Sequence, residues 1–229
     1  MTLRLRDRLE GDLVIEVAFT GVSLDVGDRA EASVRQAALA AVAAETGAEP
    51  VLMRQVHGAT VAVVEDPAAP TPEADALVTD RAGVALLARA ADCVPLLLGD
   101  PYAGVAAAVH AGRGGLVAGV VPAAVSRMRD LGADRVTGWL GPYVCGACYE
   151  VPDGLRSAVS EVVPEAWSVT SWDTPAVDLG AGVRTQLAAV GVDVVHELGG
   201  CTREDDRFPS HRRDGERATR FAGVVWMRS

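Results

Sequence analysis

The chain has 229 residues, of which 49% are hydrophobic and 23% charged. This composition supports a globular protein with a buried core. The formal net charge of −10 argues against a surface built for nucleic acid or anionic lipid, because the long-range field would repel both. No apolar run approaches the roughly 20 residues that a membrane helix needs, and residues 1–12 lack the apolar stretch of a signal peptide. We therefore expect a cytoplasmic protein that binds neither nucleic acid nor membrane.

The first half of the chain predicts one helix followed by strands. Residues 29–47 predict a helix, because alanine dominates the segment and Gly47 stands where a helix commonly ends. Two strands around a tight turn at His57-Gly58 are expected next, over 51–58 and 59–66. Runs rich in Val, Leu and Ala and bounded by Gly, Pro and Asp then predict buried strands within 74–80, 83–100 and 103–112.

The second half alternates helices with shorter apolar segments. Residues 116–133 predict a helix that carries Pro122 in its first turns, where proline is tolerated. The remaining segments predict a strand running into a loop at 134–144, helices at 154–163 and 178–191, and strands at 192–200 and 221–227. Strands thus cluster in pairs and do not alternate strictly with helices, which favours an α+β fold over a doubly wound parallel sheet.

Two histidines and one cysteine stand at the ends of apolar, strand-like runs. His57 and His110 occur in VHG and VHAG, and Cys93 lies in ADCVP within a very apolar stretch. A strand end beside glycine is where sites are commonly built. Imidazole and thiolate suit Zn²⁺, and three protein ligands with an open fourth position describe a catalytic zinc. The alternative is a cysteine that packs as a small hydrophobe beside hydrogen-bonded histidines.

The remaining cysteines give a weaker pattern. Cys145 and Cys148 form a CxxC, but a zinc knuckle needs a second pair, and only Cys201 and a histidine remain, at uncharacteristic distances. A redox role would place the CxxC at a helix N-terminus after a strand. We expect these cysteines to serve packing or a loop turn.

Arginines gather in the polar tail. Arg212 and Arg213 lie in SHRRDG, a turn that would project both side chains toward one point. Such a charge run is commonly a solvated face, but guanidinium groups also match phosphate oxygens. These two arginines are therefore candidate phosphate ligands. Asp92 lies beside Cys93. Its functional role would be to orient a metal ligand or to move a proton, and its structural role would be to cap the turn before Val94.

Six segments taken together resemble one family. They are RQVHG (54–58), ADALVTD (74–80), ADCVPLLLGD (91–100), VHAGRGGL (109–116), GPYVCGACYEV (141–151) and CTREDDRFPSHRRDGERATRFA (201–222). In their order and spacing they resemble the YfiH family of laccase-like proteins, once described as multicopper polyphenol oxidases and now as purine nucleoside phosphorylases. The resemblance covers residues 14–226.

The resemblance implies a fold, a metal and a reaction. It implies a single domain over 1–229, built as a four-layer α/β/β/α sandwich, and it makes His57, Cys93 and His110 the zinc ligands. The implied activity is phosphorolysis of adenosine, inosine, guanosine and methylthioadenosine, with adenosine deamination beside it. Purine nucleosides and inorganic phosphate are the expected partners, and the protein is expected to be a monomer or a homodimer.

The sequence departs from the family pattern around the substrate. Arg113 stands where the family has Trp and Gly114 where it has Arg, and His211 stands where Tyr is common. The N-terminal FTTRxGGVS motif is contracted to FTGVSLDVGD (19–28). These changes concern the substrate pocket more than the metal.

Two other functions are weighed against the zinc enzyme. A copper-dependent phenol oxidase would need a blue-copper centre and further histidine-rich copper clusters, but the chain has four histidines in total. A catalytically inactive, partner-binding member of the family is the third class.

Overall fold

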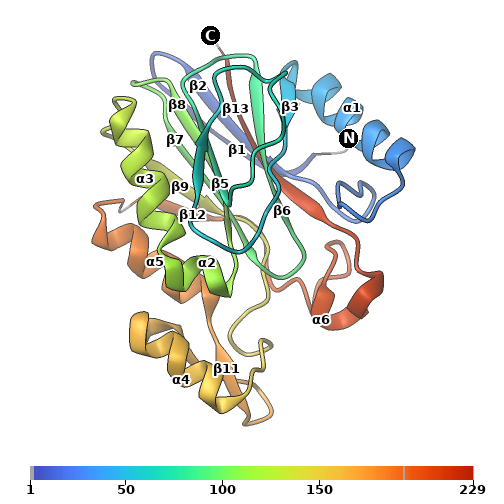
Figure 1. Cartoon of the computed structure of the whole chain (residues 1–229), viewed down its shortest axis with the longest axis vertical. Helices are drawn as coiled ribbons and strands as arrows, with labels where there is room; N and C mark the ends of the chain where they lie inside the picture. Colours follow the sequence, from blue (N-terminus) through green and yellow to red (C-terminus); the bar gives the residue numbers. More distant parts are fainter. Residues whose placement is uncertain (1–2, 193, 229) are drawn as a thin grey trace.

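The computed structural model describes residues 3–192 and 194–228 (Figure 1). Asp193, within the predicted strand 192–200, and both ends of the predicted domain 1–229 lie outside the described residues. The helices are α1 (Ala32–Thr46), α2 (Arg113–Ala118), α3 (Val120–Asp130), α4 (Asp153–Val162), α5 (Leu179–Ala189) and α6 (His211–Asp214). The strands are β1 (Arg4–Glu10), β2 (Val14–Phe19), β3 (Glu49–Val51), β4 (Val61–Val63), β5 (Ala76–Thr79), β6 (Val84–Ala90), β7 (Val94–Asp100), β8 (Val105–Ala111), β9 (Thr137–Leu140), β10 (Trp167–Val169), β11 (Pro175–Val177), β12 (Val195–Glu197) and β13 (Phe221–Arg228).

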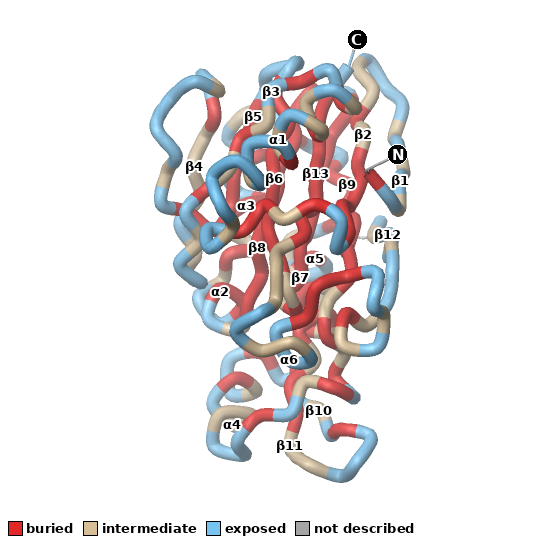
Figure 2. Tube along the Cα trace, turned by 90° about the vertical axis from the view of Figure 1, so that its right-hand side faces the viewer, coloured by how far each residue is buried: buried red, intermediate tan, exposed pale blue. Residues whose placement is uncertain are grey.

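Two mixed sheets form the body of the molecule. One has the order β1-β2-β13-β6-β3 and the other β12-β9-β7-β8-β5-β4, while β10 and β11 form a separate hairpin. Strands β6, β7 and β8 are buried along their whole length, as the red central strands of Figure 2 show. They are buried on both faces, which explains why their sequences are apolar with no alternation except at Arg89, Asp100 and His110.

The two sheets and the helices on their outer faces form four layers, and an apolar core fills each of the three spaces between them. Ile15, Phe19 and Trp139 belong to the layer between the two sheets. Helix α1 covers the outer face of the five-stranded sheet through Ala38 and Val42. Helices α2, α3, α4 and α5 contribute to the apolar layer on the outer face of the six-stranded sheet, opposite α1 in Figure 1. The α+β prediction and its α/β/β/α layering are confirmed.

The predicted hairpin around His57-Gly58 is wrong. Strand β3 pairs with β6 in the five-stranded sheet, whereas β4 pairs with β5 in the six-stranded sheet. The intervening segment therefore crosses from one sheet to the other. Its turn is held by a buried carboxylate, described below, and not by strand pairing.

Other expected elements form with adjusted ends. The predicted helix 116–133 divides at Gly119, whose φ of +80° ends α2, and Pro122 lies in the first turn of α3 as expected. The N-terminal hairpin β1–β2 was not predicted, because charge dominates β1. Its alternation of exposed and half-buried residues is nevertheless that of a strand. Within the described residues, no helix is long and apolar enough to cross a membrane.

Candidate active site

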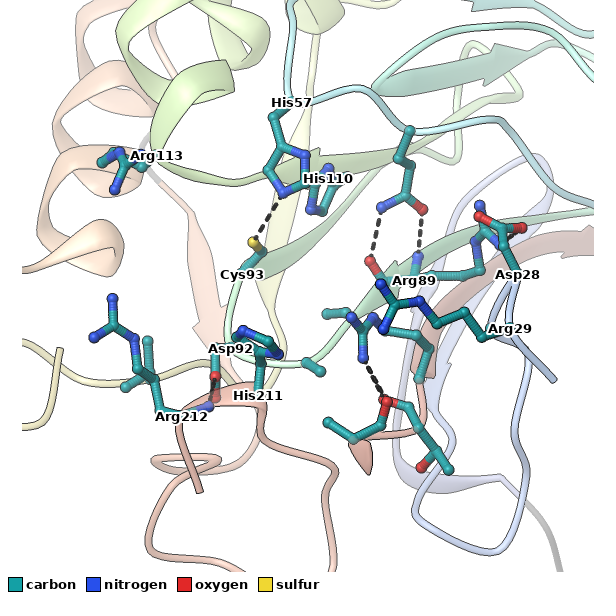
Figure 3. Close-up of a pocket in the computed structure, with 18 of the residues that line it drawn as sticks. Asp28, Arg29, His57, Arg89, Asp92, Cys93, His110, Arg113, His211 and Arg212 are labelled. Atoms are coloured by element: carbon teal, nitrogen blue, oxygen red, sulfur yellow. Dashed lines mark hydrogen bonds and ion pairs between the residues drawn. The ribbon is translucent and has the colours of Figure 1, made fainter. Parts of the chain in front are cut away.

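The structure brings His57, Cys93 and His110 together, and we call them the histidine–cysteine triad. Cys93 immediately precedes β7, and Pro95 of β7 is paired with His110 of the antiparallel neighbour β8. The ligand atoms of the triad all lie within 4.8 Å of one another. Cys93 Sγ is 3.8 Å from His57 Nε2, and the two imidazole rings meet edge to face with centroids 4.7 Å apart (Figure 3). Residues far apart in sequence thus present three metal-binding atoms to one point.

Asp75 positions both histidines. Its fully buried carboxylate accepts hydrogen bonds from the backbone N–H groups of His57 at 2.9 Å and Gly58 at 2.7 Å. It also lies 2.9 Å from His110 Nδ1. His57 adopts a left-handed φ of +61°, a strained conformation for a non-glycine residue, and these bonds hold it there. With Nδ1 bound to Asp75, His110 keeps Nε2 for the site. Sequence reasoning missed Asp75, whose only signal was an acid leading an apolar strand.

Charge interactions favour the ionised forms of Cys93 and His110. Burial opposes ionisation, but attraction to His110 and hydrogen bonds from both histidines lower the pKa of Cys93 to about 6. Burial also opposes a charge on His110, but Cys93 and Asp75 raise its pKa to about 9. Hydrogen bonds from His110 and from the backbone likewise outweigh burial at Asp75 and lower its pKa. At neutral pH the two residues therefore form a thiolate–imidazolium pair: the sulfur is in the form that binds metals, and His110 releases its Nε2 proton when a metal binds.

Glycines let the three ligand segments approach one another. A Cβ at Gly112 would lie 2.7 Å from His57 Cδ2 and 3.1 Å from Cys93 Sγ. A Cβ at Gly114 would lie 2.7 Å from the carbonyl oxygen of His57. Both distances to His57 are shorter than real Cβ contacts. The GRGG sequence after His110 is therefore required for packing of the turn at His57 against α2.

The donor set of the triad fits zinc. One thiolate and two imidazoles converge, and the Asp75 carboxylate binds Nδ1 of His110, as carboxylates do in zinc sites where they fix the tautomer of the histidine ligand. No methionine is among the described residues that line the site, although a blue-copper centre commonly uses one as its axial ligand. Three ligands leave a fourth position open, which is the arrangement of catalytic zinc.

The triad opens on a cavity of about 560 Å³. This volume is within the range of small-molecule sites. The cavity lies between the N-terminal segment before α1, the turn at His57, the turn from β6 to β7, the start of α2 and the C-terminal tail. Its described lining includes Asp25, Asp28, Arg29, Gln55, Arg89, Asp92, Arg113, Val144, Tyr149, His211, Arg212 and Arg220. Despite the acidic chain, this wall is rich in arginine.

The arginines of the cavity differ in whether a carboxylate neutralises them. Arg29 is paired with Glu216 and Arg89 with Asp28. The Arg113 side chain has no hydrogen-bond or ion-pair partner within residues 3–192 and 194–228. In the view of Figure 3, Arg113 and Arg212 lie on one side of the cavity and Arg29 and Arg89 on the other. The side with Arg113 and Arg212 therefore keeps its positive charge.

The two candidate phosphate ligands of the tail are placed differently. Arg212 lines the cavity, lies over the Tyr149 ring at 4.6 Å and donates to the carbonyl of Glu150 at 2.8 Å. Arg213 is absent from the described lining. Its guanidinium donates to the carbonyls of Thr202 and Phe208 at 2.7 and 2.9 Å. Arg212 thus faces the cavity, whereas Arg213 braces the tail.

Asp92 connects the turn of Cys93 to the C-terminal tail. Its buried carboxylate accepts hydrogen bonds from Thr202 Oγ1 at 2.6 Å, Ser210 Oγ at 2.7 Å and the Arg212 N–H at 2.7 Å. The residue has a φ of +95°. These bonds differ from the orienting and capping roles expected from the sequence, because the carboxylate holds a distant segment and binds neither Cys93 nor the following turn among the described residues. It fixes the backbone from which Arg212 reaches the cavity. The proton-transfer role stays a prediction.

Comparison with known proteins places the chain in a family. The family model described as multi-copper polyphenol oxidoreductase laccase matches residues 7–228. The chain is 54% identical over 182 residues to purine nucleoside phosphorylase SCO2081 of Streptomyces coelicolor, covering 77% of this chain and 74% of the relative. It is 42% identical over 203 residues to purine nucleoside phosphorylase Rv2149c of Mycobacterium tuberculosis, covering 87% and 81%.

A solved structure agrees over the whole chain. Protein NMB0706 of Neisseria meningitidis superposes with a TM-score of 0.85 at 26% identity, covering 99% of this chain and 100% of that one. The matches span both sheets and all three segments of the triad. The chain belongs to the YfiH family, whose model carries the laccase description.

Proposed function

We propose that the protein is a zinc-dependent purine nucleoside phosphorylase with accompanying adenosine deaminase activity. Adenosine, inosine, guanosine and methylthioadenosine are its proposed substrates, together with inorganic phosphate. The observation that carries the proposal is that the triad, Arg113 and Arg212 open on the same cavity, and neither of these guanidinium groups has a carboxylate partner among the described residues. The names of the curated relatives support the phosphorylase part.

His57, Cys93 and His110 would hold the zinc ion. When bound, zinc supplies a Lewis acid at the wall of the cavity. The chain itself supplies the geometry, because Asp75 fixes the turn of His57 and the ring of His110. The open side of the triad faces the cavity, which leaves room for a substrate atom.

Phosphorolysis needs a phosphate held against the ribose. A phosphate oxygen forms a bond to C1′ while the bond from C1′ to the base nitrogen breaks, and the base keeps that electron pair. Arg212 and Arg113 are suited to hold the phosphate, because no carboxylate neutralises them among the described residues and a guanidinium presents paired donors. The bonds of Arg213 to the tail argue against the same role for this arginine.

Phosphate dependence tests the reaction. We expect base and ribose 1-phosphate to be released from inosine only when phosphate is supplied. An inert buffer should abolish base release but leave adenosine deamination, which uses water in place of phosphate. Base release that is indifferent to phosphate would make the protein a hydrolase, and the absence of both reactions would favour the partner-binding alternative.

The ligand count argues against a multicopper oxidase. Of the four histidines, His57 and His110 belong to the triad, whereas His196 stacks on Trp139 and His211 lines the cavity. Among the described residues, no metal-binding group contains more than these two histidines. Copper clusters of laccases need many more. The cytoplasmic location and the monomeric or homodimeric state stay predictions from the sequence.

A further inference from the structure

A second group of metal-binding side chains lies outside the triad. Cys145, Cys148, Cys201 and Glu204 place three sulfurs and a carboxylate oxygen within 4.8 Å of one another. We call these residues the cysteine–glutamate cluster. All three cysteines are free thiols, and Cys148 is buried. The three cysteines with a histidine gave no zinc-site spacing in the sequence, whereas the structure supplies Glu204 as the fourth member.

Two turns of the same kind build the cluster. Each turn carries its two members three residues apart, as Cys145-x-x-Cys148 and Cys201-x-x-Glu204. In the first turn the N–H of Cys148 donates to the carbonyl of Cys145 at 2.9 Å, and in the second the N–H of Glu204 donates to the carbonyl of Cys201 at 3.1 Å. Paired turns with this spacing are how zinc knuckles and ribbons assemble four ligands.

Hydrogen bonds already join the two turns. The N–H of Thr202 donates to the carbonyl of Tyr143 at 3.0 Å, and Tyr143 forms a β-bridge with Cys201. The N–H of Cys145 points to Cys201 Sγ at 3.4 Å, the kind of backbone contact that stabilises a metal-bound sulfur. Cys148 Sγ lies 3.5 Å from Glu204 Oε1. The four donor atoms are thus held together by the backbone of both turns.

We propose that the cysteine–glutamate cluster is a second, structural metal site that binds Zn²⁺. Three thiolates and one carboxylate complete a four-coordinate shell and leave no open position, which is the hallmark of structural zinc. Thiolate-rich sets select zinc or Cu(I) over Mg²⁺ and Ca²⁺. The proposal stands on these residues alone and does not depend on the proposed phosphorylase activity.

The second site would fix one wall of the cavity. The first turn is flanked by Val144 and Tyr149, both of which line the cavity. The second turn contains Thr202, which donates a hydrogen bond to Asp92. Asp92 also accepts from the N–H of Arg212, and the Arg212 guanidinium lies over the Tyr149 ring. A metal joining the two turns would therefore fix the position of Tyr149 relative to Arg212. Its role is one of positioning, at a distance from the reacting atoms.

Metal content of the full chain tests the proposal. We expect two zinc ions per chain in the protein purified under reducing conditions. Cys93→Ala should keep one, held by the cluster, and the Cys148→Ser/Cys201→Ser variant should keep one, held by the triad. The triple variant should keep none. One ion in the unaltered protein that disappears with Cys93→Ala would overturn the proposal, as would two ions retained by Cys148→Ser/Cys201→Ser.

A milder variant keeps the test decisive if the serine variants fail to fold. In the Cys93→Ala background, Glu204→Gln should lower zinc retention against a chelator, while Asp206→Asn, an exposed acid two residues away, should not. Cobalt gives a second readout, because Cys93→Ala loaded with Co²⁺ should show the strong sulfur-to-metal absorption of three thiolates. Equal zinc retention by Glu204→Gln and Asp206→Asn, or a cobalt spectrum without thiolate absorption, would contradict the site.

Discussion

The triad and the cysteine–glutamate cluster use similar atoms in opposite settings. The triad takes its ligands from the ends of two buried strands and from the turn between β3 and β4, and its open side faces a cavity. The cluster takes its donors from two short turns, each closed by its own backbone hydrogen bond. Three ligands beside a cavity are the arrangement of a catalytic metal, whereas four donors in paired turns are the arrangement of a metal that stabilises a loop. The number of ligands and what they face therefore distinguish the two sites better than residue type does.

The largest effect is expected from removing the thiolate of the triad. Cys93→Ala deletes a ligand that normally lies about 2.3 Å from zinc, so phosphorolysis and deamination should both fall to background and the metal of the triad should be lost. Elemental analysis and both assays would check this. Cys148→Ser is the matched control, because it should leave the metal of the triad in place. Full activity in Cys93→Ala would remove the triad from the mechanism.

Arg212→Gln should affect phosphate more than nucleoside. A charge-assisted hydrogen bond contributes about 1.5–3 kcal/mol, so the KM for phosphate should rise roughly 10- to 150-fold. Zinc content should not change, and the rate of adenosine deamination should fall much less than the rate of phosphorolysis. Steady-state kinetics in phosphate and in adenosine would separate these effects.

Arg213→Gln is the control for that prediction. Its guanidinium binds two carbonyls of the tail and Asp214, so the variant should lower the Tm and leave the KM for phosphate close to that of the unaltered protein. If Arg213→Gln raises this KM and Arg212→Gln does not, the assignment of the two arginines is reversed.

Asp75→Asn tests how the triad is organised. An amide cannot accept from both backbone N–H groups and His110 with the same charge assistance, and outer-shell substitutions of this kind typically cost about 10- to 100-fold in metal affinity. Competition with a chelator would measure the loss at the triad. The exposed Asp80→Asn in the same segment serves as the control. Unchanged affinity in Asp75→Asn would mean that the backbone alone positions the ligands.

The buried strands and the members of the triad were predictable because their signals are local, whereas the four-layer arrangement was implied by the resemblance to the YfiH family. Runs of Val, Leu and Ala mark strands buried on both faces, and polar breaks within them mark His110 and Cys93 as unusual. His57, which also precedes a glycine, was grouped with them from the residues, and the resemblance to the YfiH family then made all three the expected zinc ligands. Residue patterns indicated where a strand ends, and the family pattern indicated which ends meet.

The errors arose where long-range contacts decide the structure. The strands expected around His57 separate into two sheets, because their partners β6 and β5 are supplied by later segments. The roles of Asp75 and Asp92 depend on hydrogen bonds to residues 17 to 120 positions away. Arg212 and Arg213 are neighbours with the same side chain, and only the tertiary fold directs one to the cavity. The charged N-terminal strand was missed because its half-buried alternation carries few large apolar residues.

The smallest effect on activity is expected at Asp92, which connects the triad to the turn of the cysteine–glutamate cluster. Asp92→Asn retains one side-chain oxygen for Thr202 and Ser210, but its NH₂ group cannot accept from the N–H of Arg212. Losing a single hydrogen bond of about 0.5–1.5 kcal/mol corresponds to roughly a 2- to 12-fold rise in the KM for phosphate, with metal content unchanged.

Asp92→Gly separates the carboxylate from the backbone at this position. Glycine adopts the φ of +95° without strain, yet it removes all three hydrogen bonds to the tail. We therefore expect Asp92→Gly to raise the KM for phosphate more than Asp92→Asn does, because Arg212 loses its anchor. If glycine behaves like the unaltered protein and asparagine does not, the turn of Cys93 needs only its backbone conformation, and the tail is positioned by other contacts.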